Sequence, residues 1–305
     1  MAKTGVALLF AVSLFVTGCT ADAEKIDHGL VITTIRPYAL IADEIAGARL
    51  RVETLLPPQI SPHTWSPRPG ELERVAKAGL IIANGFGLET RLGSFLDRFA
   101  ARTLYVSSLL GFEEVRSAPE FRRHDTEGDH DAHPVDAGDP HFWTDPSLMI
   151  RLADIIAEHF TILDPRGEAV YQANYVQFTN KVHIVDRRIR EQVGKYRRRS
   201  LITFHDAFMR FFARYGIERI AAIMPLPGRE PSAAGLAELG GMIRARGVQA
   251  LYSEPQLDPK SAEILASEYN LRMYILDPLG AHEGITNYTS LLLFNWEQLQ
   301  KGFSR

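Results

Sequence analysis

Cysteine is almost absent from this chain of 305 residues: Cys19 is the only one, so no disulfide can form within the chain. An excess of charge of either sign is also lacking, since 34 Lys and Arg residues nearly balance 37 Asp and Glu residues. The formal net charge is −3, and the single basic run, residues 195–199, ends a helix-compatible segment, where cations complement the helix dipole. We therefore expect no nucleic-acid partner. After the N-terminus, no apolar run reaches the roughly 20 residues that a membrane-spanning helix needs, so the body of the chain is predicted to be globular and outside the bilayer.

The N-terminal segment has the features of an export signal. Lys3 supplies the positive start, an apolar stretch follows, and small residues precede Cys19. The sequence Val16-Thr17-Gly18-Cys19 resembles the lipobox of bacterial lipoproteins, in which cleavage leaves the cysteine as a lipid-bearing N-terminus. We predict a signal peptide over residues 1–18, lipidation of Cys19 and a lipidated tether over residues 19–28. An ordinary secretory signal is the alternative.

Short apolar runs alternate with helix-compatible segments along the chain, which is typical of α/β folds with parallel sheets. The runs predicted as strands are Leu30–Thr34, Arg51–Leu56, Leu80–Asn84, Thr103–Val106, Leu201–Phe204, Ile220–Ile223, Ala250–Tyr252 and Met273–Leu276. The predicted helices are Pro37–Ala46, Gly70–Ala78, Leu88–Ala100, Ala207–Tyr215, Ser232–Arg246, Pro259–Glu268 and Tyr288–Lys301, with another that begins near Pro146.

The segment that follows Asp164 stays helix-compatible to about Arg199, which is unusually long for a helix of a globular protein. Because the strand–helix alternation restarts after it, this segment is predicted to connect two lobes. We expect an N-terminal lobe over residues 29–164, a connecting helix over residues 165–199 and a C-terminal lobe over residues 200–305. The predicted fold class is α/β, with a mainly parallel four-stranded sheet flanked by helices in each lobe.

The candidate metal ligands are His63, His141, His205 and Asp277, which lie in predicted loops, two in each lobe. In open α/β sheets ligands bind outside the carboxyl ends of strands, so these loops can converge in a cleft between the lobes. No compact ligand motif such as His-Glu-x-x-His accompanies them. Taken alone, the turn that holds His141 is better explained by an imidazole that caps a backbone group.

Seven short motifs make the pattern more specific. They are Pro62-His63-Thr64-Trp65, Asn84-Gly85-Phe86-Gly87-Leu88-Glu89, Asp139-Pro140-His141-Phe142-Trp143-Thr144-Asp145-Pro146, Phe204-His205-Asp206-Ala207-Phe208, Glu230-Pro231-Ser232-Ala233, Ser253-Glu254-Pro255-Gln256 and Leu276-Asp277-Pro278-Leu279-Gly280. With these motifs in this order, essentially the whole mature chain resembles the metal-binding lipoproteins that serve as solute receptors for bacterial ATP-driven zinc and manganese importers. The resemblance implies two lobes joined by a rigid helix, a metal in the cleft bound by His63, His141, His205 and Asp277, and a membrane permease as partner.

Three imidazoles and one carboxylate form a nitrogen-rich set that suits tetrahedral Zn²⁺, whereas Mn²⁺ prefers more oxygen ligands. Members of this family that carry manganese typically have a carboxylate where this chain has His205. The resemblance therefore favours Zn²⁺ as the transported ligand, with Mn²⁺ or Fe²⁺ as the alternative. Glu254 is predicted to orient a ligating imidazole, unless it is a buried structural carboxylate. Asp145 and Asp206 are expected to cap helices, and Glu230 and Ser232 to organise the start of the helix that follows them, so none of the four is expected to bind metal.

A low-complexity segment rich in acids and histidines, residues 122–139, precedes the second candidate ligand. Zinc-importing members of the family carry a similar, longer insertion at this place. We predict an accessory metal site at His124, His130 and His133, and a flexible solvated loop is the alternative. His28, His159, His183 and His282 lack a motif and are expected to be structural or surface residues.

The sequence thus predicts an extracytoplasmic zinc-binding receptor that is anchored by its lipid to a bacterial membrane and delivers Zn²⁺ to an ATP-driven importer. We expect a monomer that is not an enzyme. Because capture requires deprotonated ligands, affinity should fall as histidines protonate toward about pH 6. A zinc hydrolase would need an open position on the metal, which Asp277 is expected to fill. A surface adhesin is a further alternative.

Overall fold

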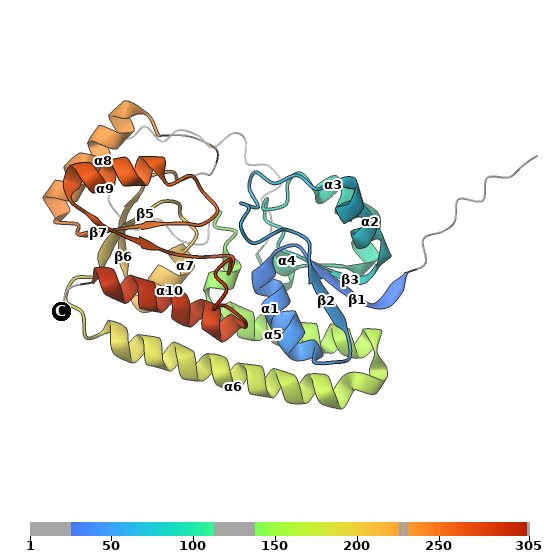
Figure 1. Ribbon diagram of the computed structural model, residues 1–305. Helices are drawn as coiled ribbons and strands as arrows, with labels where there is room; N and C mark the ends of the chain where they lie inside the picture. Colours follow the sequence, from blue (N-terminus) through green and yellow to red (C-terminus); the bar gives the residue numbers. More distant parts are fainter. Residues whose placement is uncertain (1–25, 113–137, 226–227, 229–230, 304–305) are drawn as a thin grey trace, which may run out of the picture.

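The structure of the chain is a computed structural model that describes residues 26–112, 138–225, 228 and 231–303 (Figure 1). The predicted signal peptide and Cys19 lie outside these residues, and so do His124, His130 and His133. Within the described part of the chain, no helix is both long enough and apolar enough to cross a bilayer.

Each half of the chain forms one parallel four-stranded sheet. The first has the order β2-β1-β3-β4, from β1 (Asp27–Thr33), β2 (Arg51–Thr54), β3 (Ala78–Ala83) and β4 (Thr103–Tyr105). The second repeats this order as β6-β5-β7-β8, from β5 (Ser200–Thr203), β6 (Glu218–Ala222), β7 (Ala250–Ser253) and β8 (Arg272–Ile275). In each sheet the strand order reverses between two central neighbours, β1 and β3 in the first sheet and β5 and β7 in the second. Open α/β sheets bind ligands at such a point. The predicted fold class is confirmed.

Helices flank both sheets. Those of the first half are α1 (Arg36–Ala46), α2 (Pro69–Lys77), α4 (Val106–Leu109) and α5 (Pro146–Leu163). Those of the second half are α7 (Met209–Tyr215), α8 (Ala233–Arg246), α9 (Lys260–Tyr269) and α10 (Tyr288–Gly302). Asp145 caps α5 by accepting a hydrogen bond from the backbone nitrogen of Ser147 at 2.8 Å, and Ser232 caps α8 in the same way. Both caps are as predicted.

The helix predicted over Leu88–Ala100 begins later than expected and is an α-helix for only part of its length. Only Gly93–Leu96 is α-helical (α3), and a 3-10 helix, η1 (Asp97–Arg102), follows it. Gly85, Phe86 and Gly87 have left-handed φ values of 72°, 54° and 75°, which turn the chain before a helix can begin. Phe99, with φ −120° and ψ 23°, interrupts the later part. Apolar spacing does not reveal such backbone turns.

The long helix α6 (Glu168–Val193, 26 residues) runs along both lobes (Figure 1). It begins after a 3-10 turn, η3 (Pro165–Gly167), and ends before the predicted Arg199. Tyr171, Phe178, Val182 and Ile189 lie at helical spacing on its buried face. This face packs on α1 and α5 of the first lobe and on α7 and α10 of the second. One hydrophobic cluster therefore continues from lobe to lobe, and the two lobes share a core.

Candidate metal centre

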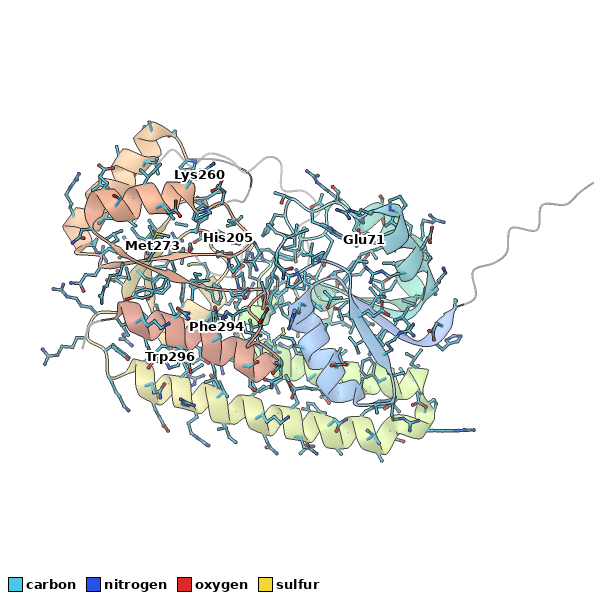
Figure 2. The ribbon with its side chains drawn as sticks, in the orientation of Figure 1. Glu71, His205, Lys260, Met273, Phe294 and Trp296 are labelled. Atoms are coloured by element: carbon cyan, nitrogen blue, oxygen red, sulfur yellow. The ribbon has the colours of Figure 1, made fainter. Side chains whose placement is uncertain are left out.

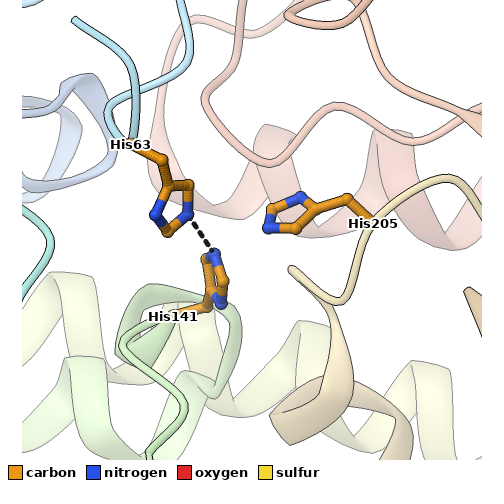
Figure 3. Close-up of side chains that lie close together, drawn as sticks. All are labelled: His63, His141 and His205. Carbon is orange, nitrogen blue, oxygen red and sulfur yellow. Dashed lines mark hydrogen bonds between the residues drawn. The ribbon is translucent and has the colours of Figure 1, made fainter. Parts of the chain in front are cut away.

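Three histidines from three separate loops meet between the lobes (Figure 3). His63 lies in the loop after β2, His205 follows β5, and His141 directly precedes a 3-10 turn, η2 (Phe142–Thr144). Figure 2 shows His205 on the side of the second lobe that faces the first. The parallel sheets place the carboxyl ends of β2 and β5 on either side of the interface between the lobes, so residues distant in sequence reach one point.

The ring nitrogens of these histidines are close enough to bind one ion. One ligating nitrogen of each ring lies within 4.8 Å of the other two, and Nε2 of His63 is 3.2 Å from Nε2 of His141. Two nitrogens bound tetrahedrally to one zinc ion at about 2.0–2.1 Å are separated by about 3.3 Å. His63 and His141 thus already have the spacing that a tetrahedral zinc site requires.

Two carboxylates hold the opposite ring nitrogens. Nδ1 of His141 lies 2.6 Å from Oδ1 of Asp139, and Nδ1 of His205 lies 3.1 Å from Oε1 of Glu254. A carboxylate accepts hydrogen bonds, so Nδ1 carries the proton when either ring is neutral, and each Nε2 then offers a lone pair, which in His141 lies toward Nε2 of His63. Both imidazoles are therefore fixed in the tautomer that binds a metal through Nε2.

Burial and charge affect the three imidazoles differently. Burial, together with the neighbouring His141 and His205, lowers the pKa of His63 to about 2, so His63 stays neutral. Burial also lowers the pKa of His205, but the charge and hydrogen bond of Glu254, together with the charges of Asp206 and Asp139, outweigh burial, and the net pKa is raised. Nε2 of His205 is buried and has no hydrogen-bond partner. An unpaired nitrogen lone pair beside a buried anion favours a cation at this point.

The three rings line a small cavity. Its walls include Ser61 and Pro62 beside His63, Trp143 beside His141, and Gln256 and Leu279 from the second lobe. The space open to the centre of a water-sized sphere is about 10 Å³, which is the size of one water molecule or one small ion. The site is therefore suited to a single ion and has no room for an organic substrate.

Asp277 is not part of the three-histidine group. Its carboxylate is buried, and it accepts hydrogen bonds from the backbone nitrogens of Gly280 at 2.9 Å and His282 at 2.8 Å. Nε2 of Gln256 donates to Oδ1 of Asp277 at 3.1 Å and also to the carbonyl oxygen of Pro58, in the loop that carries His63, at 2.7 Å. The role of Asp277 as fourth ligand stays a prediction.

Asp206 does not cap the following helix, contrary to the prediction. α7 begins only at Met209, with Phe208 in the cap position. The chain bends through residues 204–208 first, and Asp206 instead lies 3.1 Å from Nε of Arg219 on β6. Glu230 lies outside the described residues.

Asp139 is the functional residue that sequence reasoning missed. It was recognised only as part of a motif, although a carboxylate two residues before a candidate ligand is close enough to contact the Nδ1 atom of that ligand. Its backbone contact supports the same geometry, because Oδ1 also accepts a hydrogen bond from the backbone nitrogen of His141 at 2.9 Å.

Comparison with known proteins agrees with this geometry. The model of a family described as "Zinc-uptake complex component A periplasmic" matches residues 31–302. The "High-affinity zinc uptake system protein ZnuA" of Haemophilus ducreyi is 29% identical over 263 residues, which cover 82% of this chain and 85% of that protein. The protein of the same name from Bacillus subtilis is 27% identical over 284 residues, which cover 90% of this chain and 88% of the relative.

A crystal structure of a zinc-bound ZnuA deletion mutant superposes with a TM-score of 0.75 at 25% identity and covers 90% of this chain and 98% of that chain. Sequence and fold thus agree over most of the chain. The chain belongs to the family of periplasmic zinc-uptake component A proteins.

Proposed function

We propose that the chain captures Zn²⁺ outside the cytoplasmic membrane and presents it to the membrane permease of an ATP-driven importer. The observation that carries this proposal is the convergence of three histidines, with Nε2 of His63 and Nε2 of His141 at 3.2 Å. Both relatives described above are named for zinc uptake. The family is one of uptake components, so the chain is a transport protein and not an enzyme.

Ligand chemistry supports zinc over manganese. Three imidazole nitrogens are the majority of a four-coordinate shell, and this composition suits Zn²⁺ better than Mn²⁺, which prefers oxygen. In our proposal Asp277 completes the shell after its carboxylate leaves one or more of its loop hydrogen bonds. Glu254 and Asp139 orient the imidazoles of His205 and His141 from behind.

The remaining parts of the proposal concern location and partners. We propose that lipidated Cys19 anchors the receptor, as a monomer, to the extracytoplasmic side of a bacterial membrane. His124, His130 and His133 would form an accessory site that collects zinc near the cleft. Deletion of residues 123–135 should then lower the zinc stoichiometry; an unchanged stoichiometry and affinity would rule out the accessory site.

Metal binding by the purified mature chain tests the central proposal. We expect one tightly bound Zn²⁺ in the cleft, measured by competition with a chromogenic chelator, and weak displacement by excess Mn²⁺. His205→Ala should lose most of this affinity because it removes a ligand from the second lobe. His183→Ala, on the exposed face of α6, is the matched control and should bind like wild type. Equal binding by wild type and His205→Ala would remove His205 from the site.

A further inference from the structure

Arg210 is a buried cation between the lobes. It lies on α7 of the second lobe, five residues after His205, and its side chain is only 5% exposed. A buried charge is costly unless it is paired and hydrogen-bonded. Its Nη2 donates to the backbone oxygen of Asp139 at 2.8 Å, and its Nε lies 3.5 Å from Oδ2 of Asp139. Arg210 of the second lobe thus contacts Asp139 of the first, the residue whose carboxylate contacts Nδ1 of His141.

Two aromatic rings of the first lobe fix the guanidinium in place. Its central carbon lies 4.7 Å from the ring centroid of Phe112 and 4.7 Å from that of Phe142. These two rings are stacked on one another with centroids 4.7 Å apart. A planar, delocalised guanidinium can meet a ring face and a carboxylate at the same time, which an ammonium does less well. The identity of the residue therefore matters as well as its charge.

Asp139 transmits this contact to the candidate ligand. Its Oδ1 is occupied by the backbone nitrogen and the Nδ1 atom of His141. Its Oδ2 is buried, has no hydrogen bond and faces Arg210 at ion-pair distance. Without the positive charge, a buried carboxylate would be left uncompensated, and its geometry toward His141 would change.

We propose that Arg210 is a positioning residue for the captured metal. By holding Asp139, it fixes the tautomer and the angle of His141, and it does so from the first turn of α7, which directly follows the loop that carries His205. The positions of two candidate ligands from opposite lobes are thereby coupled by one side chain, which acts on His141 through Asp139. This inference rests on the proposed function, in which His141 and His205 bind the ion.

The test compares Arg210→Met and Arg210→Lys with wild type in two measurements. The first is zinc affinity by chelator competition, where Arg210→Met should bind about 10- to 100-fold more weakly, as expected when the partner of a ligand is displaced, and Arg210→Lys should lie between. The second is ¹⁵N NMR of the histidine rings in the metal-free protein. There the Nδ1–H signal of His141 should shift or broaden in Arg210→Met, and less so in Arg210→Lys.

Arg36→Met is the matched control. Arg36 on α1 also crosses between the lobes, since its Nη2 donates to the carbonyl oxygen of Ile285 at 2.7 Å, but it does not hold Asp139. It should keep wild-type zinc affinity and the wild-type His141 signal. Equal losses in both variants would mean that any interlobe contact suffices, and unchanged signals in the Arg210 variants would refute positioning. If wild type binds no zinc, the proposed function fails, whereas the metal-free NMR comparison still decides the role of Arg210.

Discussion

At the residue scale, Glu254 is the carboxylate that determines the charge around His205. Burial lowers the pKa of His205, and Glu254 makes the largest contribution in the opposite direction, so that with Asp206 and Asp139 the net pKa is raised. In Glu254→Gln the pKa of His205 should therefore fall, and zinc affinity should fall about 10- to 100-fold, because the charged acceptor that orients the ring is replaced by a neutral, weaker one. NMR titration of the metal-free protein and chelator competition measure the two effects. Glu263→Gln, at an exposed position on α9, is the control and should change neither.

The residues that could be predicted from the sequence are those with a motif around them. His63, His141 and His205 stood in recognisable motifs, and the structure brings all three together. Arg210 gave no signal, because its contact with Asp139 joins residues 71 positions apart and depends on how two lobes pack. Pairings of this kind arise from tertiary structure and not from local sequence. Asp277 lies in a motif, but the motif does not reveal that backbone nitrogens of its own loop donate hydrogen bonds to its carboxylate.

At the scale of elements, Asp186 joins α6 to α7. Its carboxylate accepts hydrogen bonds from Nε of Arg214 and from the hydroxyl of Tyr215, each at 2.8 Å. Asp186→Asn keeps the shape of the side chain but removes its charge. It should lower the free energy of unfolding by about 1–3 kcal/mol, since charged hydrogen bonds are lost in a buried place. Urea denaturation at pH 7 measures this change, and Glu158→Gln, exposed on α5, should leave the free energy unchanged.

The same carboxylate predicts a dependence of stability on pH. Burial raises the pKa of Asp186, but the hydrogen bonds from Arg214 and Tyr215 outweigh it and lower the pKa from 3.8 to about 2. A pKa that is lower in the folded state gives a stabilisation that is complete above about pH 4 and disappears as the pH falls toward 2. The difference between wild type and Asp186→Asn should therefore shrink over this interval. A constant difference from pH 7 to pH 2 would contradict this assignment.

Elements were predictable where apolar spacing and caps agreed. Asp145 and Ser232 begin their helices as expected, and all eight expected strands are present within a few residues of their predicted ends. The turn at Gly85–Gly87 and the interruption at Phe99 were not predictable, because backbone angles and not side-chain polarity determine them.

At the scale of the whole molecule, the contacts between the lobes oppose a wide hinge motion. The indole nitrogen of Trp143 donates to the carbonyl oxygen of Pro278, and the hydroxyl of Tyr288 donates to the carbonyl oxygen of Trp143, each at 2.8 Å. Both bonds are buried, and the core that surrounds them extends across α6 into both lobes. Opening the lobes would expose this apolar surface and break buried hydrogen bonds, so it would cost far more than a rearrangement of the surface loops.

We therefore expect metal binding to move the loops of His63 and Asp277 and to leave the distance between the lobes nearly unchanged. Spin labels on cysteines introduced at the exposed positions Glu73 of α2 and Glu263 of α9 can measure this distance, in a mature chain whose only native cysteine, Cys19, is replaced by serine. The distance distributions with zinc and with a chelator should overlap. Trp143→Phe removes one interlobe hydrogen bond and should broaden the metal-free distribution. A displacement of the mean by more than the width of the distribution in wild type would show that the lobes do rotate, and that α6 bends.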